Sequence, residues 1–170
     1  MSNELDVYVS RFQNIPGVNI RAVVKDGQDS AAWYEVKMSD VVADLVVNEL
    51  TIPSQLMTVS AEIQKWGRLS ALTKRVWELE ERKYRAWRSE FSLSVMNPAT
   101  KDKDWKKPTG DTIECMYRVQ PEYHSKQAAV EQAEEVFNTA EAILQAFRAK
   151  KDVLITMRRR YHEDGAAAHS

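Results

Sequence analysis

The sequence predicts a mainly α-helical fold: a long, coiled-coil-like antiparallel helical hairpin preceded by a small N-terminal α/β segment. Two stretches with apolar residues at heptad-like spacing, residues 53–94 and 122–162, carry this prediction. The stretches are similar in length and are joined by a lysine-rich connector, which favours antiparallel neighbours. Glycine and proline number only five each among 170 residues, so little interrupts a helix. Two matched arms with one charged tip suggest a scaffold more than a catalyst.

The expected boundaries divide the chain into three parts. Residues 1–48 form the small N-terminal segment, residues 49–162 the helical hairpin, and residues 163–170 a flexible tail. Within the hairpin we expect a basic loop over 95–111 and a short helix over 112–119. At about 1.5 Å per residue, arms of about 40 residues would each be roughly 60 Å long.

The N-terminal segment has the residue pattern of a β-hairpin flanked by helices. Residues 18–24 and 33–38 are β-branched and aromatic, with a turn-like sequence at 25–27. A helix is expected over 4–13, and another over 39–48, capped by its first two residues. Because a two-stranded hairpin is marginal alone, this one needs a surface on which to lie.

The first arm begins at Pro53, whose fixed backbone suits the start of a helix. Its apolar seam is interrupted by the polar residues Ser70, Thr73 and Glu80, and it widens in the middle. One hairpin cannot cover a stripe this wide, so we expect a homo-oligomer in which several hairpins share the seam. The residues expected at that interface are Leu56, Val59, Ile63, Trp66, Trp77, Phe137, Leu144 and Phe147.

The connector has its own start and stop signals. Asn97 and Pro98 should end the first arm, because proline cannot continue a helix. Thr109 can cap the short helix, and Pro121 should open the second arm.

Composition excludes several classes of protein. The single cysteine, Cys115, rules out an internal disulfide and fits a reducing cytoplasm. The N-terminus has no signal-peptide pattern, and no apolar run approaches the ~20 residues that span a membrane. The net charge of −1 hides an asymmetry. Residues 1–56 carry eight acids against four bases, whereas the remainder carries 17 acids against 20 bases.

Catalytic motifs are absent from the sequence. None of the three histidines belongs to a set with metal-ligand spacing, and no nucleotide-binding or hydrolase motif occurs. A two-arm hairpin also offers little concavity for a substrate. We therefore expect no enzymatic activity, no catalytic residue, no cofactor and no metal ion.

The loop 101–107 is one candidate for a nucleic-acid interface. Four lysines flank one tryptophan, a pattern that suits phosphate neutralisation around a stacked base. The alternative is a solvated polar loop whose tryptophan folds back on the hairpin, because two aspartates halve the charge. The residues concerned are Lys101, Lys103, Trp105, Lys106 and Lys107.

A second candidate lies at the end of the first arm, where four bases are interleaved with Tyr84 and Trp87. Such a stretch could track a phosphate backbone. Alternatively, an antiparallel hairpin sets it against three glutamates of the second arm, and ion pairs would occupy part of its charge. Tryptophans on the seam are expected in the core rather than at a ligand. The bases are Arg82, Lys83, Arg85 and Arg88, and the glutamates are Glu131, Glu134 and Glu135.

A third basic cluster lies near the C-terminus. It could grip nucleic acid, or it could face the acidic N-terminal third, beside which a hairpin would place it. The sequence leaves both uses open. The cluster consists of Arg148, Lys150, Lys151, Arg158, Arg159 and Arg160.

Four segments carry a resemblance to a known family. They are DLVVNELTIPSQL at 44–56, the stretch 66–91 that ends in the basic-aromatic residues, TIECMYRVQPEY at 112–123, and the second arm as far as Leu154. With these segments the chain resembles the UvsY-type recombination mediator proteins of bacteriophages over residues 44–161. The N-terminal residues do not match the family, so their role stays open.

The resemblance implies a non-enzymatic accessory factor of phage homologous recombination and DNA repair. Such mediators form ring-like oligomers, bind single-stranded DNA, contact the single-strand-binding protein and a RecA-like recombinase, and help to load that recombinase onto covered DNA. By position, the basic segment of the family falls on Lys83 and Arg85, with Arg82 and Arg88 adjacent. The protein would then act in the host cytoplasm. The alternative from another class is a coiled-coil adaptor that binds proteins and no nucleic acid.

Overall fold

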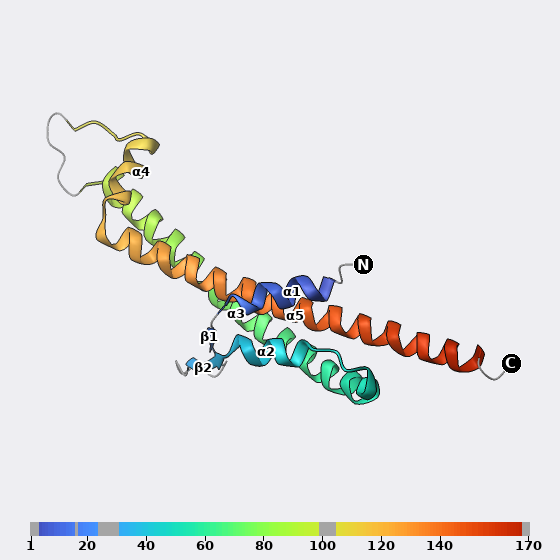
Figure 1. The fold of residues 1–170 in the computed structure, drawn as a ribbon. Helices are drawn as coiled ribbons and strands as arrows, with labels where there is room; N and C mark the ends of the chain where they lie inside the picture. Colours follow the sequence, from blue (N-terminus) through green and yellow to red (C-terminus); the bar gives the residue numbers. More distant parts are fainter. Residues whose placement is uncertain (1–3, 16, 24–30, 99–104, 168–170) are drawn as a thin grey trace. The chain divides into compact units, whose positions relative to one another are not determined.

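The computed structural model describes residues 4–15, 17–23, 31–98 and 105–167. It has a mainly α-helical fold, which confirms the predicted class (Figure 1). In chain order the elements are α1 (Glu4–Gln13), β1 (Val18–Val23), β2 (Ala31–Val36), α2 (Met38–Leu45), the 3-10 helix η1 (Glu49–Thr51), α3 (Ile52–Met96), α4 (Gly110–Arg118) and α5 (Pro121–Ala167).

The chain divides into two compact units. Unit 1 comprises Met1–Thr73 and Val136–Ser170, and unit 2 comprises Lys74–Glu135. Both long helices, α3 and α5, contribute to each unit. This division differs from the expected boundaries at 48 and 162, because the N-terminal segment joins the adjoining halves of the long helices in unit 1.

The helix boundaries follow the proline and cap signals of the sequence. α5 starts at Pro121, and α3 ends at Met96, directly before Asn97. The side-chain oxygen of Thr109 accepts a hydrogen bond from the backbone N–H of Thr112 at 3.3 Å, which caps α4 as expected. α4 begins at Gly110, two residues before the expected start.

The expected tail at 163–170 is helical through Ala167, so that boundary was placed too early. Gly165 alone costs about 1 kcal/mol in a helix, and the alanines that follow are the best helix formers. A single glycine therefore does not end α5.

Unit 1 has one apolar core, to which the N-terminal helices and the long helices both contribute. The buried residues Val59 and Trp66 of α3 share it with Leu144, Phe147 and Leu154 of α5. From α1 and α2, the core also receives Leu5, Phe12, Met38, Val41 and Leu45. The N-terminal segment is therefore part of the same folded body as the helices beside it.

The long helices run antiparallel within unit 1. The hydroxyl of Ser70 on α3 donates to Glu141 on α5 at 2.6 Å, and Tyr161 near the end of α5 donates to Glu49 in η1 at 3.2 Å. Glu49 precedes Ser70 in the chain, but its partner Tyr161 follows Glu141, the partner of Ser70. This direction agrees with the predicted antiparallel arrangement.

The N-terminal β-hairpin is present. β1 pairs with β2 antiparallel, in a register that runs from Val18 opposite Val36 to Val23 opposite Ala31. Val18 and Val36 pack against the unit 1 core, which supplies the surface that a two-stranded hairpin needs. The expected turn at 25–27 lies outside the described residues.

The predicted cap of α2 is wrong. The helix begins at Met38, and its N-cap residue, Lys37, makes no side-chain capping bond. The hydroxyl of Ser39 donates instead to the side chain of Asp40 at 3.3 Å. Met38, the first residue of the helix, is only 1% exposed, so burial of its apolar side chain contributes to the stability of this end.

The polar residues that interrupt the seam are satisfied inside the single chain. Ser70 donates to Glu141, and the hydroxyl of Thr73 donates to the carbonyl oxygens of Leu69 and Ser70 at 3.1 and 3.0 Å. Within the described residues, no buried side-chain nitrogen or oxygen lacks a hydrogen-bond partner. These residues therefore need no second hairpin to pair with them.

Several residues expected at an oligomer interface lie in this core. Val59, Trp66, Leu144 and Phe147 are each 4% exposed or less. A second copy could reach them only if the core opened. The other expected interface residues, Leu56, Ile63, Trp77 and Phe137, are half-buried.

Candidate nucleic-acid interface

The aromatic residues of the basic stretch belong to a cluster of rings in unit 2. Trp87 of α3 lies 6.2 Å from Tyr117 of α4, and Tyr84 lies 6.3 Å from Tyr123 of α5, measured between ring centres. Tyr117 and Tyr123 are 5.7 Å apart. Such tilted and edge-on ring pairs are the geometries that aromatic side chains prefer. Trp87 thus packs within unit 2, as predicted for the seam tryptophans.

Arg88 is built into this aromatic cluster. Its guanidinium carbon lies 4.7 Å from the ring centre of Tyr117 and 5.7 Å from that of Tyr84, both within cation–π range. Burial, followed by the neighbouring Tyr123, raises the pKa of Tyr84 above its usual value. Arg88 therefore has a packing role besides its charge.

Lys83 and Arg85 are paired, but with glutamates of their own helix. Lys83 Nζ lies 2.7 Å from Glu80 Oε1, and Arg85 forms an ion pair with Glu81. The side chains of Lys83 and Arg85 remain 56% and 69% exposed. Exposed intrahelical pairs contribute only about 0.3–0.5 kcal/mol each, so a phosphate can displace the glutamate at little cost.

The expectation that the opposing glutamates of the second arm would take up this charge is therefore corrected. Within the described part of the chain, no ion pair joins the basic stretch to Glu131, Glu134 or Glu135. A helical residue reaches i+3 and i+4 neighbours without further ordering of the chain, which favours the local partners. The fourth base, Arg82, donates from Nε to the backbone oxygen of Glu78 at 3.2 Å.

Only part of the loop 101–107 is described. Lys106 and Lys107 are exposed, and Trp105 is half-buried. Lys101 and Lys103 lie outside the described residues. Unit 2 thus contains Arg82, Lys83, Arg85 and Arg88 on one helix, and Lys106 and Lys107 on the segment that leads to α4.

The charges of unit 2 are segregated along the chain. Residues 82–109 carry eight bases and three acids, whereas residues 110–135 carry two bases and six acids. Unit 2 as a whole is close to neutral, so its attraction for a polyanion depends on this segregation.

A shallow hollow of about 590 Å³ lies on the last turns of α3, next to the basic stretch. Its serine and apolar residues were not predicted from the sequence as part of a site. One available signal was a leucine just after the bases, and Leu93 is 57% exposed in the structure. The lining residues are Arg85, Arg88, Ser89, Ser92, Leu93 and Met96.

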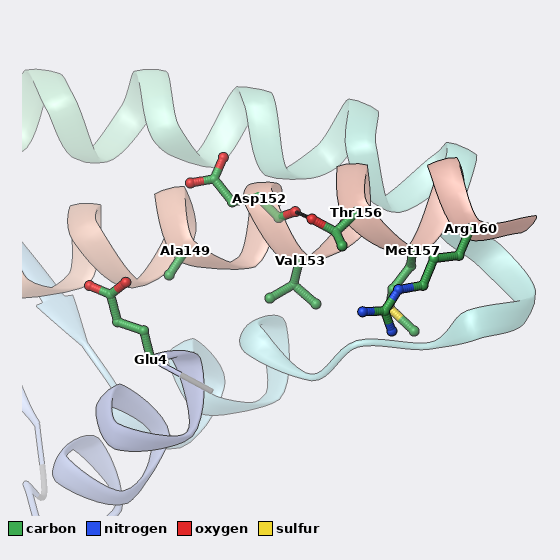
Figure 2. Close-up of a pocket in the computed structure, with 7 residues that line it drawn as sticks. All are labelled: Glu4, Ala149, Asp152, Val153, Thr156, Met157 and Arg160. Carbon is green, nitrogen blue, oxygen red and sulfur yellow. Dashed lines mark hydrogen bonds between the residues drawn. The ribbon is translucent and has the colours of Figure 1, made fainter. Parts of the chain in front are cut away.

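Unit 1 has a hollow of about 470 Å³ between the first residue of α1 and the C-terminal half of α5. Figure 2 shows Val153 and Met157 pointing to the side of α5 on which Glu4 lies, with Arg160 extending along that side. Ala149, Asp152 and Thr156 complete the lining. Its charges have mixed sign, so the hollow does not favour a polyanion.

One residue of the C-terminal basic cluster, Lys150, contacts the N-terminal third, which is one of the two uses that the sequence left open. Lys150 is only 5% exposed, and its Nζ donates to the backbone oxygens of Asp44 and Val46 at 2.6 and 3.0 Å. These carbonyls lie at the end of α2, so Lys150 caps a helix of the N-terminal third. Burial lowers the pKa of Lys150, and Asp44 opposes this shift. Arg158 and Arg159 are exposed.

A second hollow of unit 1, of about 200 Å³, has an acidic rim. Its floor contains the buried residues Val41, Trp66, Leu69 and Phe147. Around them lie four carboxylates and two lysines, contributed by Glu35, Lys37, Asp40, Asp44, Glu62 and Lys65. A net negative rim repels phosphate, which leaves the basic stretch of α3 as the better nucleic-acid candidate.

Comparisons with protein-family models, with curated proteins and with solved structures found no match. In the described residues, no helix combines the length and the apolar character needed to cross a bilayer. The same residues contain no cluster of three or more histidine, cysteine, aspartate or glutamate side chains arranged to hold a metal ion.

Proposed function

We propose that the protein binds single-stranded DNA through the basic stretch of α3, residues 82–88, in unit 2. The observation that carries this proposal is the exposure of Lys83 and Arg85, which form ion pairs with glutamates of their own helix. Arg82 is exposed on the same helix, and Lys106 and Lys107 are exposed in the same unit. Binding replaces weak carboxylate pairs by phosphate contacts and releases counterions from the DNA.

The affinity should depend strongly on salt. Each phosphate neutralised on a single strand contributes about −0.7 to the slope of log K against log salt, so four contacts give a slope of about −3. Over a rise from about 50 to 200 mM salt, that slope corresponds to binding roughly fifty-fold weaker.

The cellular role that we propose is that of a non-enzymatic recombination mediator. This step rests on the resemblance to the UvsY-type family, whose basic segment corresponds to Lys83 and Arg85. In that role the protein helps to load a RecA-like recombinase onto DNA covered by single-strand-binding protein. It works as a homo-oligomer in the cytoplasm, without a cofactor.

Fluorescence anisotropy of a labelled oligo-dT, titrated with the full chain across a salt series, tests DNA binding. We expect micromolar or tighter binding at low salt and a steep loss as salt rises. Absence of binding at low salt would reject the proposal.

A protein-binding adaptor is the second candidate, and uncovered apolar side chains in unit 1 favour it. Leu50 is 92% exposed, Met57 78% and Val46 62%. A protein partner that covered these side chains would remove their apolar surface from water. The anisotropy experiment separates the two candidates, because an adaptor of this kind leaves oligo-dT unbound at every salt concentration.

A further inference from the structure

We propose that the hollow at the C-terminal end of α3 holds one nucleotide of the bound strand, with its phosphate at Arg85 and its base on Leu93 and Met96. This inference rests on the proposed single-strand binding and adds a defined base site to it. It gives a role to residues beyond the basic motif, namely Ser89, Ser92, Leu93 and Met96.

The hollow exists because two small residues lie between larger ones. Ser89 and Ser92 follow Arg85 at steps of four and three residues, which places all three on one face of the helix. The hydroxyl of Ser89 donates to the backbone oxygen of Arg85 at 2.9 Å, and that of Ser92 donates to the backbone oxygen of Arg88 at 2.7 Å. Both hydroxyls thus turn back onto the helix, and a flat ligand can approach its surface.

The two ends of the hollow differ in chemistry. At one end, Arg85 is 69% exposed, and its guanidinium matches the geometry of phosphate oxygens. At the other end, Leu93 is 57% exposed and lies beside Met96. Bases present an apolar face to side chains, so the apolar end suits a base and the arginine end suits a phosphate.

The helix dipole favours the same orientation of the nucleotide, with its phosphate toward Arg85 and its base toward Met96. Within the described residues, the last turn of α3 contains no basic residue to offset the partial negative charge of the terminal carbonyls. That charge repels a phosphate from Met96 and leaves a neutral base unaffected. The phosphate of the bound DNA therefore favours the end of the hollow nearest to Arg85.

The double variant Leu93→Ala/Met96→Ala, made in the full chain, tests the base site by oligo-dT anisotropy across a salt series. We expect about three- to tenfold weaker binding at each salt concentration, from the lost apolar area. The salt slope should stay unchanged, because an apolar contact releases no counterion. The matched control is Leu50→Ala/Met57→Ala, which removes the same pair of side chains from exposed positions in unit 1. It should bind like the wild type.

The possible outcomes separate the two proposals. If the wild type does not bind oligo-dT, both the proposed function and the base site are rejected. If the wild type binds and Leu93→Ala/Met96→Ala binds equally well, only the base site is rejected. If Leu93→Ala/Met96→Ala keeps the DNA affinity of the wild type but forms assemblies of a different mass in mass photometry, the hollow contacts protein and the base site is rejected. Leu93→Gln, which keeps a good helix former, repeats the test should the double variant lose helicity in circular dichroism.

Discussion

The guanidinium carbon of Arg88 lies 4.7 Å from the ring centre of Tyr117, a residue of α4 that is only 5% exposed. This contact joins the basic stretch of α3 to the helix after the connector. It distinguishes Arg88 from Lys83 and Arg85, whose side chains form ion pairs with Glu80 and Glu81 of their own helix. One stretch of helix therefore contains both a structural cation and cations available to a ligand.

Replacement of Arg88 by alanine should destabilise the protein by about 1–2 kcal/mol, because it removes two cation–π contacts and the packing of the side-chain stem. Arg88→Lys should recover only part of this loss, since an ammonium lacks the planar group that stacks on a ring. Urea unfolding followed by circular dichroism measures both effects. Equal unfolding midpoints for the wild type and Arg88→Ala would show that the contact does not stabilise the fold.

Loss of the buried amine of Lys150 should lower the free energy of unfolding by more than the replacement of Arg88 does. Lys150→Met keeps most of the apolar stem but leaves the carbonyl oxygens of Asp44 and Val46 without their donor, a loss of about 2 kcal/mol or more. Arg148→Met is the matched control, because it removes one charge from an exposed position on the same helix. Similar free energies of unfolding for the two variants would contradict the capping role of Lys150.

The lowered pKa of Lys150 predicts a pH dependence. Because its pKa in the folded state lies below the ordinary value of 10.5, the unfolded chain binds more protons in the interval between the two values. The free energy of unfolding contributed by Lys150 should therefore rise as the pH increases through the folded-state pKa toward 10.5. The measurement is the difference in unfolding free energy between wild type and Lys150→Met, from neutral pH upward. A difference that falls over this range would contradict the assigned direction.

The pair Ser70 and Glu141 should stabilise the packing of α3 against α5 in unit 1. Ser70→Ala removes the 2.6 Å hydrogen bond from a half-buried carboxylate and should cost about 1 kcal/mol. Ser89→Ala serves as the control, because its hydroxyl is exposed and bonds only within its own helix. Chemical denaturation of both variants gives the comparison, and equal stabilities would mean that the interhelical bond contributes nothing.

The sequence predicted the elements whose limits are set locally. Pro121, Asn97 and Thr109 act through the backbone of their own neighbourhood, and the helices begin and end beside them. The β-hairpin likewise follows from residue types that alternate along the chain.

Features that depend on the register between long helices were not predictable in this way. Heptad spacing shows which residues share a face, but it does not show that Glu141 lies opposite Ser70. Nor does a C-terminal lysine in a basic cluster reveal that it caps α2 from 104 and 106 positions away. The ion-pair partners in the candidate site were unpredictable for the same reason, because only the structure shows whether Lys83 pairs with a glutamate of its own helix or of another.

The central claim is that Lys83 and Arg85 hold phosphates. The most direct test is the salt dependence of oligo-dT binding by Lys83→Gln/Arg85→Gln, compared with Lys65→Gln/Arg118→Gln. The control removes ion pairs of the same two spacings, Lys65 with Glu62 and Arg118 with Glu114, at similar exposure. We predict that the slope of log K against log salt becomes shallower by about 1.4 for the first variant, the equivalent of two phosphate contacts. The slope for the control should match the wild type. Equal slopes for all three proteins would contradict the assignment of Lys83 and Arg85 to DNA binding.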